Sequence, residues 1–265
     1  MIILLSPTKQ MDFDSPLPAA FKQQNDTGDW GLPRFSTEAA GIMEDLSLFS
    51  RSELETLMQI SPAISAAVIR MISDFSKDSC TIRPAITAYS GTVFKAMNVA
   101  TLEDEQLLFA ENRLRILSGL YGVLKPFDGI KAYRLEMKTP LCLNNGEKLS
   151  TFWRPRITAA LASEKDLSNP DEPILNLASG EYMKAVDIKK IHNPVISIHF
   201  RDIIHGKLKT VGMYSKVARG KAVRLILEHK INRPEQFKSI PVGGYNYNSE
   251  LSTESELVFI RREDG

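Results

Sequence analysis

The chain starts with an unbroken apolar run, Ile2 to Leu5, which is followed at once by Ser6, Pro7, Thr8 and Lys9. A short apolar run that ends in proline and polar residues predicts a buried strand. Pro and Gly are scattered through all 265 residues, and the sequence shows no repeat, low-complexity tract or long linker. We therefore expect a single compact domain over residues 1–265.

Helix-like and strand-like patterns follow one another without strict alternation, which predicts an α+β (mixed α/β) fold with a mixed sheet surrounded by helices. Residues 14–33 have the composition of a long irregular loop. Predicted helices begin at Ser36, Ser52, Pro62 and Gly91, extend from Thr101 through Leu117, and cover about 150–165 and 215–230. Predicted strands are 84–90, 132–137, 173–178, 195–201, 208–213 and 257–261.

Composition excludes several classes of protein. Hydrophobic residues make up 43% and charged residues 25%, as in an ordinary globular chain rather than a disordered one. Cys80 and Cys142 stand far apart without a CxxC spacing, so a disulfide framework or zinc ribbon is not expected. The first apolar run is too short for a signal peptide, and no stretch approaches 18 apolar residues. We expect a cytoplasmic protein that does not enter a membrane.

The formal net charge of +1 conceals a strong local asymmetry. The formal net charge is −5 for residues 1–60, +4 for residues 113–138 and +7 for residues 201–238. Such polarised charge can produce a large potential on one surface of a nearly neutral molecule. It favours a polyanionic partner, although basic side chains that merely coat solvated faces give the same counts.

The segment from Arg113 to Pro126 combines basic residues with two glycines. Gly119 and Gly122 flank a tight turn that we predict to lie between two helices, where bare backbone amides can bind a phosphate oxygen. This resembles the helix-hairpin-helix of DNA repair proteins, although the usual Gly-apolar-Gly has one residue fewer. A helix C-cap followed by an ordinary turn explains the same glycines. The DNA-binding residues predicted here are Arg113, Arg115, Ser118, Gly119, Tyr121, Gly122 and Lys125.

A second basic cluster lies in the helix predicted for residues 215–230. Lys216 and Arg224 share one face at helical spacing, and apolar residues occupy the other. A helix that contacts phosphates has this pattern, as does any amphipathic surface helix. We predict that Lys216, Arg219, Lys221 and Arg224 contact DNA.

Polar residues also follow two predicted strands, a common position for a ligand. Ser6 and Lys9 follow the first, and Glu181 follows the strand at 173–178, while Arg134 and Glu136 form a charged pair on another. An alternative function is therefore an enzyme that acts on a nucleotide or nucleic acid, with a pocket around these five residues. The sequence lacks GxSxG, Walker, GxGxxG and HExxH motifs, so no catalytic residue is assigned and the balance is against an enzyme.

The histidines give no metal site. His199 and His205 would converge across a strand–turn–strand, but no carboxylate or cysteine pattern completes an iron or zinc site. We predict neither a metal nor another cofactor.

Seven blocks taken together resemble the YaaA family of bacterial peroxide-stress-resistance proteins, in one order over nearly the whole chain. They are Leu5–Phe13, Leu114–Pro126, Tyr133–Met137, Phe152–Trp153, Asn176–Tyr182, Lys216–Gly220 and Gly244–Tyr245.

The resemblance implies a cytosolic protein that limits peroxide damage and lowers unincorporated iron. It also implies binding to double-stranded DNA, with bulged or junction DNA preferred, through a helix-hairpin-helix that falls on Ser118 to Gly122. We expect a monomer that protects DNA from iron-dependent oxidation by contacting its backbone. Its binding should weaken as salt rises.

Overall fold

The computed structural model describes residues 1–19, 21, 30–164 and 169–262. Within this part of the chain, the main sheet has eight strands in the order β4-β3-β1-β6-β7-β10-β9, and β8 pairs with β7. Strands β3, β1, β6, β7 and β10 are parallel, whereas β4, β8 and β9 pair antiparallel with their neighbours. The bounds are β1 (Ile2–Leu5), β3 (Leu114–Ser118), β4 (Gly122–Leu124), β6 (Ile174–Asn176), β7 (Val195–Ile204), β8 (Lys207–Lys209), β9 (Asn246–Asn248) and β10 (Glu256–Arg262), and a separate pair is formed by β2 (Arg83–Pro84) and β5 (Gly129–Ile130).

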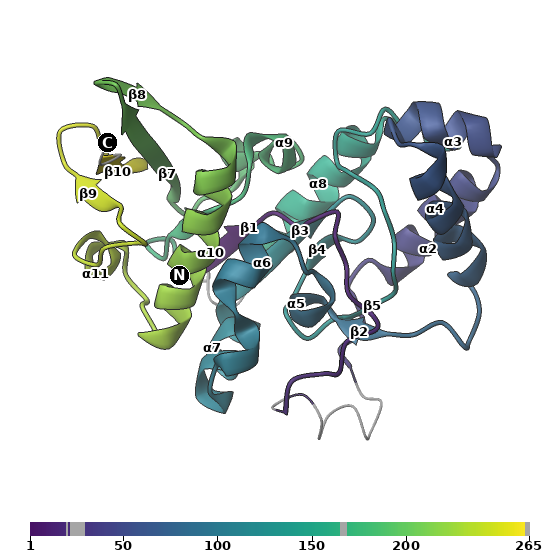
Figure 1. The fold of residues 1–265 in the computed structure, drawn as a ribbon, viewed down its shortest axis with the longest axis horizontal. Helices are drawn as coiled ribbons and strands as arrows, with labels where there is room; N and C mark the ends of the chain where they lie inside the picture. The colour runs from purple at the N-terminus through teal and green to yellow at the C-terminus, as the bar shows by residue number, and fades with distance from the viewer. Residues whose placement is uncertain (20, 22–29, 165–168, 263–265) are drawn as a thin grey trace.

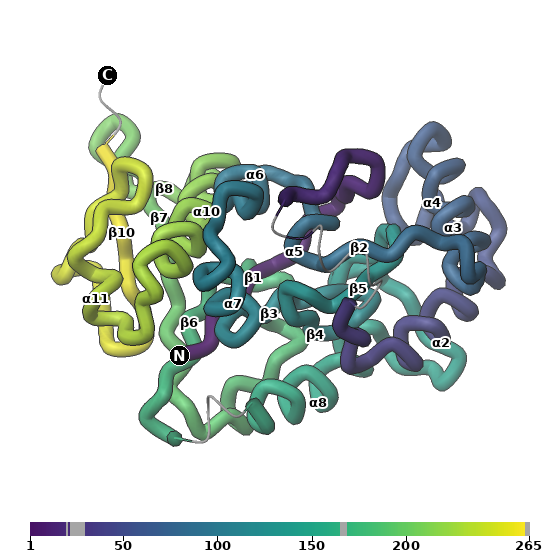
Figure 2. The backbone as a smooth tube through the Cα atoms, turned by 90° about the horizontal axis from the view of Figure 1, so that it is seen from below, coloured from purple at the N-terminus to yellow at the C-terminus, as the bar shows by residue number. Residues whose placement is uncertain are grey.

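Helices lie on both sides of this sheet, as Figures 1 and 2 show. Helices α6, α7 and α10 cover one face, α8 covers the other, and α2, α3 and α4 gather at the end beyond β4. The α+β architecture predicted from the sequence is thereby confirmed. The helices are α2 (Ser36–Ser47), α3 (Arg51–Met58), α4 (Pro62–Asp74), α5 (Ala85–Ala88), α6 (Thr92–Met97), α7 (Asp104–Arg113), α8 (Leu149–Ala162), α9 (Gly180–Met183), α10 (Gly212–Glu228) and α11 (Pro234–Lys238), with 3-10 turns η1 (Val99–Thr101) and η3 (Ile188–Lys190).

Strand β1 lies in the interior of the sheet, between β3 and β6. All four of its side chains are completely buried, as the unbroken apolar run predicts. β3 neighbours β1 on one side, and β6 neighbours it on the other. The parallel strand that follows β1 is β3, whereas the strand that follows β6 is β7, on the side of β6 away from β1. The connections from β1 and β6 therefore leave in opposite directions, and the carboxyl ends of these two strands are a switch point where open parallel sheets bind ligands.

Three predicted elements are wrong, and the strand predicted for 208–213 is shorter than expected, because β8 ends at Lys209 and α10 begins at Gly212. The helix predicted to extend through Leu117 ends at Arg113, because Leu114 to Ile116 pair with Ile3 to Leu5 in the sheet. Residues 85–88, predicted as strand, form the short helix α5, and residues 132–137 are neither helix nor strand. Part of the loop predicted for 14–33, residues 20 and 22–29, lies outside the described residues.

No single helix in the described ranges is long and apolar enough to cross a bilayer. Among the described helices, α3 and α4 are the one pair that together meets the criteria of length and composition, and the chain bends by 108° between them.

Helix α10 lies directly against α6 because one of its buried residues has no side chain. A Cβ atom on Gly220 would stand 2.1 Å from the Val93 carbonyl oxygen and 2.7 Å from the Ala96 Cβ. Both atoms belong to α6. The close approach brings the first half of α10 beside the residues that follow β1.

The loop after β4 contains a buried carboxyl group. Asp128 is only 6% exposed, and its Oδ2 accepts a hydrogen bond of 2.8 Å from the Lys125 amide. Burial raises the pKa of Asp128 from 3.8 to about 7, against the lowering effect of that hydrogen bond. The folded chain therefore holds a proton that the unfolded chain releases at lower pH.

We predict opposite effects for alanine at two helical glycines. Gly220→Ala should lower the free energy of unfolding by about 1–3 kcal/mol, because the new Cβ collides with the backbone of α6. Gly41→Ala in α2 should raise it by ~0.5–1 kcal/mol, because its Cβ meets nothing within 4 Å and Ala favours helix. Urea unfolding of both variants checks this, and equal effects would contradict the packing of α10 on α6.

We also predict that Asp128→Asn changes the pH dependence of stability. A carboxyl group whose pKa is raised by folding binds more protons in the folded chain than in the unfolded chain. The free energy of unfolding therefore falls as the pH rises from the unfolded pKa to the folded pKa. The wild-type chain should therefore lose up to about 1.4 kcal/mol per pH unit between its two pKa values. Measured by urea unfolding from pH 5 to 8, the stability of Asp128→Asn relative to wild type should increase with pH. Asp74→Asn, at an exposed carboxyl whose pKa a Lys77 hydrogen bond lowers, is the control and should show no such increase. A pH-independent difference for Asp128→Asn would contradict the prediction.

Candidate functional site

The glycine segment forms a buried β-hairpin, not a helix-hairpin-helix. Strand β3 ends at Ser118, β4 begins at Gly122, and the two strands pair antiparallel. Every residue from Ser118 to Gly122 is buried. The prediction that this turn binds phosphate is therefore wrong.

Internal contacts occupy this turn. The Ser118 hydroxyl oxygen accepts hydrogen bonds from the amides of Leu120 and Tyr121, at 3.2 and 2.9 Å. Trp153 Nε1 donates to the Gly119 carbonyl oxygen at 2.8 Å. Gly122 has a φ of +68°, and a Cβ there would come within 2.6 Å of the Trp153 ring. Gly122 allows close packing of the hairpin against α8, and Gly119 allows it against the backbone of Leu135 and Glu136, where an added Cβ would stand 2.4 Å from the Leu135 carbonyl oxygen.

The basic residues around the hairpin have different surroundings. Arg115 is 2% exposed, and its guanidinium contacts both carboxylate oxygens of Glu164, at 2.6 and 2.8 Å. Because this ion pair is buried, Arg115 holds α7 and β3 to the segment after α8 and cannot contact DNA. Arg113 ends α7 and is half-buried, and Lys125 is exposed.

The four α10 cations that were predicted to contact DNA also differ in their surroundings. Arg224 donates at 2.7 Å to Glu228 and at 2.7 Å to the Asn98 carbonyl oxygen, so it fixes α10 to the turn before α7. Lys216 and Lys221 are exposed, whereas Arg219 is half-buried. The assignment of Arg224 to DNA is not supported, because its guanidinium is already occupied.

A cavity of about 360 Å³ opens at the carboxyl ends of β1 and β6. Four of the five residues predicted for a pocket line it, namely Ser6, Lys9, Glu136 and Glu181, and Arg134 does not. Two of the cations predicted for DNA, Lys216 and Arg219, also line it. The structure thus combines in one cavity residues that the sequence assigned to two sites. The remaining lining residues are Leu5, Pro7, Thr8, Gln10, Gly91, Thr92, Val93, Leu177, Ser179 and Tyr182.

Two contacts fix the loop after β1. The Ser179 amide donates to Ser6 Oγ at 2.8 Å, and Ser6 Oγ donates to Ser179 Oγ at 3.3 Å, which ties the ends of β1 and β6 together. On the other side, Thr8 lies against Gly91, where an added Cβ would come within 1.9 Å of Thr8 Oγ1. The contribution of Gly91 and α6 depends on tertiary packing, and no local pattern in the sequence indicates it.

The charges in the cavity are only partly paired. Lys9 Nζ lies 2.5 Å from Glu136 Oε1, and Lys138 Nζ lies 3.6 Å from Glu136 and 4.0 Å from Glu181. Arg219 Nε is buried and has no hydrogen-bond partner among the described residues. Burial lowers the pKa of Arg219, and no neighbouring carboxylate offsets that effect.

One residue that lines this cavity, Tyr182, is a buried tyrosine, and the buried Tyr89 and Tyr133 are not part of the lining. The Tyr133 hydroxyl lies 2.7 Å from the hydroxyls of both Tyr89 and Ser118. Burial raises the pKa of Tyr133 to about 12 and that of Tyr182 well above its usual value. These phenols stay neutral at physiological pH, so the ionisable groups of the cavity are its lysines, arginine and glutamates.

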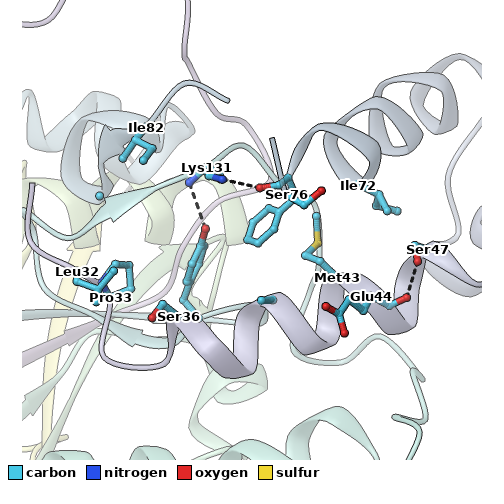
Figure 3. A pocket seen from close by; sticks show the side chains of 14 residues that line it. Leu32, Pro33, Ser36, Met43, Glu44, Ser47, Ile72, Ser76, Ile82 and Lys131 are labelled. Atoms are coloured by element: carbon cyan, nitrogen blue, oxygen red, sulfur yellow. Dashed lines mark hydrogen bonds between the residues drawn. The ribbon is translucent and has the colours of Figure 1, made fainter. Parts of the chain in front are cut away.

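A second cavity, of about 400 Å³, lies between α2, α4 and the end of β5. Figure 3 shows its mainly apolar lining, with Lys131 at one side and Met43 and Ile72 at the other. Lys131 Nζ donates to the Phe75 carbonyl oxygen at 2.5 Å, so this amine is already bound. The cavity has few groups for acid–base or phosphate chemistry.

The histidine region shows no constellation for a metal. Within the described ranges, no three His, Cys, Asp or Glu side chains lie close enough to hold an ion. His199 is half-buried on β7, with Nε2 3.9 Å from Glu256, and burial lowers its pKa.

The whole chain matches one group of bacterial proteins. A UPF0246 protein of Acaryochloris marina is 38% identical over 264 residues, which cover 98% of this chain and 100% of the relative. UPF0246 proteins of Tolumonas auensis and Paraburkholderia phytofirmans are each 36% identical and cover 99% of their own length. A family model described as peroxide stress protein YaaA matches residues 1–251. These matches confirm the resemblance, and the chain belongs to the YaaA (UPF0246) family of peroxide stress proteins.

Proposed function

We propose that this member of a peroxide stress family binds double-stranded or distorted DNA through backbone contacts and thereby limits iron-dependent oxidation of that DNA. The observation that best supports the proposal is a run of exposed lysines over β8 and the first half of α10: Lys207, Lys209, Lys216 and Lys221. None of them forms an ion pair with another described residue. We call these four residues the lysine face.

The lysine face is the part of the basic segment 201–238 in which exposed lysines have no ion-pair partner among the described residues. Arg224 is paired with Glu228, and Lys230 is paired with Glu105. Lysines without a protein partner are free to neutralise phosphates, and such contacts do not depend on base sequence. Strand β8 projects beyond the rest of the sheet in Figure 1, and only two residues separate its end at Lys209 from the start of α10 at Gly212, so the lysines of β8 closely precede those of α10 in the chain.

Helices α3 and α4 fit the shape of a helix-hairpin-helix. Three residues, Gln59 to Ser61, join them, and the chain bends by 108°. Gln59 adopts φ 51° and ψ 54°, the left-handed conformation that glycine usually supplies in such a turn. The turn is exposed at Gln59 and Ser61, and the Ser61 side chain makes no capping hydrogen bond to α4. We propose that this turn, rather than residues 118–122, contacts the DNA backbone.

Protection then needs no redox chemistry in the protein. Peroxide damages DNA where ferrous iron converts it into hydroxyl radical beside the helix. A protein that covers the backbone at bulges or junctions would exclude iron and peroxide from those positions.

We predict that Lys207→Gln with Lys209→Gln weakens binding to every duplex sequence alike and lowers the salt dependence. The slope of log affinity against log salt should fall by about 2, because two phosphate contacts are lost. Fluorescence anisotropy with labelled duplexes at four salt concentrations measures both quantities.

The matched control is Lys189→Gln with Lys190→Gln, an exposed pair on η3, a turn that packs against α8. It should bind DNA as the wild type does. Equal losses for the two double variants, or a loss confined to one DNA sequence, would contradict phosphate contacts on the lysine face.

We further predict that Ser61→Asp separates stability from DNA binding. Aspartate is a good N-cap residue, so α4 should keep or gain stability, whereas its charge should repel phosphate at the turn. Affinity for junction DNA should fall several-fold while the melting temperature does not fall. Ser52→Asp, which adds the same charge at the far end of α3, is the control. Unchanged affinity in Ser61→Asp would show that the α3–α4 turn does not contact DNA.

A further inference from the structure

We propose that the cavity at the ends of β1 and β6 binds a small phosphomonoester, with its phosphate on Arg219 and Lys216. This inference goes beyond DNA binding and does not depend on it. It begins from the half-buried guanidinium of Arg219, whose Nε is buried without a hydrogen-bond partner in the described part of the chain.

A half-buried arginine whose buried Nε has no hydrogen-bond partner is unusual. Burying a charged group without a counter-charge is costly, so buried arginines are normally paired with carboxylates, as Arg115 is with Glu164. Arg219 has no such partner, yet it lines a cavity. An anion that enters the cavity would supply the missing acceptor.

The charge count indicates how much negative charge the ligand has. Lys9 and Lys138 neutralise Glu136 and Glu181, through contacts of 2.5 to 4.0 Å. Lys216 and Arg219 are left without a described counter-charge. A phosphomonoester, which has a charge of about −1.5 to −2 at neutral pH, matches two positive charges.

The rest of the lining indicates a ligand larger than phosphate. The volume of about 360 Å³ is within the range of small-molecule sites. Carboxylates of Glu136 and Glu181 can accept hydrogen bonds from hydroxyl or amino groups, and Pro7 and Val93 provide apolar surface. A nucleoside monophosphate or a sugar phosphate has both kinds of group. The location also agrees with the fold. Open parallel sheets bind ligands beyond the carboxyl ends of their strands at a switch point, and β1 and β6 end at such a point.

The test is titration calorimetry of the full-length protein with inorganic phosphate, AMP, ribose 5-phosphate, adenosine and succinate. AMP or ribose 5-phosphate should bind saturably and more tightly than phosphate, and adenosine should not bind. Succinate, a dianion whose charges are far apart, should bind more weakly than either phosphomonoester. No saturable binding of any phosphorylated probe at millimolar concentration, or binding of succinate as tight as that of AMP, would overturn the proposal.

Variants locate the site. Arg219→Gln should lower affinity for the phosphomonoester by about 10-fold or more, because a charge-assisted contact is lost. Lys216→Gln should lower it less, since that lysine is exposed. Arg262→Gln and Lys189→Gln, at exposed positions outside the cavity, should bind as the wild type does. Equal losses in all four variants would indicate non-specific attraction and overturn the site.

Stability of the ligand-free protein gives a second readout. Because Arg219→Gln removes a half-buried charge that has no partner among the described residues, its melting temperature without ligand should be equal to or above that of the wild type, while the rise caused by AMP should disappear. If Arg219→Gln fails to fold, Lys216→Gln still tests the site. If no phosphorylated probe binds but Arg219→Gln weakens binding of duplex DNA, the cavity is part of the DNA surface and the proposal is wrong, although DNA binding stands.

Discussion

The parallel pairing of β1 with β3 on one side and β6 on the other is the constraint on which the rest of the structure depends. Because four apolar residues are completely buried there, β1 can only be interior, and the chain must leave it toward one side and return on the other. The loops after β1 and β6 then meet at one edge, where Ser6 and the Ser179 amide are joined by a hydrogen bond. Helix α10 reaches the same edge because Gly220 allows it to lie against α6.

Much of this arrangement could be predicted from local pattern. The apolar run at residues 2–5 indicates a buried strand, and the carboxyl ends of parallel strands share an edge, so Ser6, Lys9 and Glu181 converge as a candidate pocket. The arrival of Lys216 and Arg219 in that pocket could not be predicted, because it depends on how α10 packs on α6. A small residue in a helix shows that something comes close, but not which helix does so.

The glycine segment shows where local pattern is insufficient. Residues 114–117 continue the apolar periodicity of α7, yet pairing with β1 makes them a strand. Gly122 is required by the ring of Trp153, distant in sequence, rather than by a ligand. Charge is equally ambiguous, since Arg115 and Arg224 resemble their neighbours in the sequence but are occupied by Glu164 and Glu228. Whether a cation is free depends on its partner in three dimensions.

The net charge of +1 therefore underestimates what one face of the molecule offers, because Lys207, Lys209, Lys216 and Lys221 on β8 and α10 are exposed without a carboxylate partner among the described residues. We propose that this face binds DNA by its phosphates. The most direct measurement is the affinity of the wild-type protein for intact, bulged and junction duplexes over a range of salt concentrations. Four lysine–phosphate contacts predict a slope of about −3 to −4 for log affinity against log salt, with little dependence on sequence. An affinity that does not change with salt would contradict the claim.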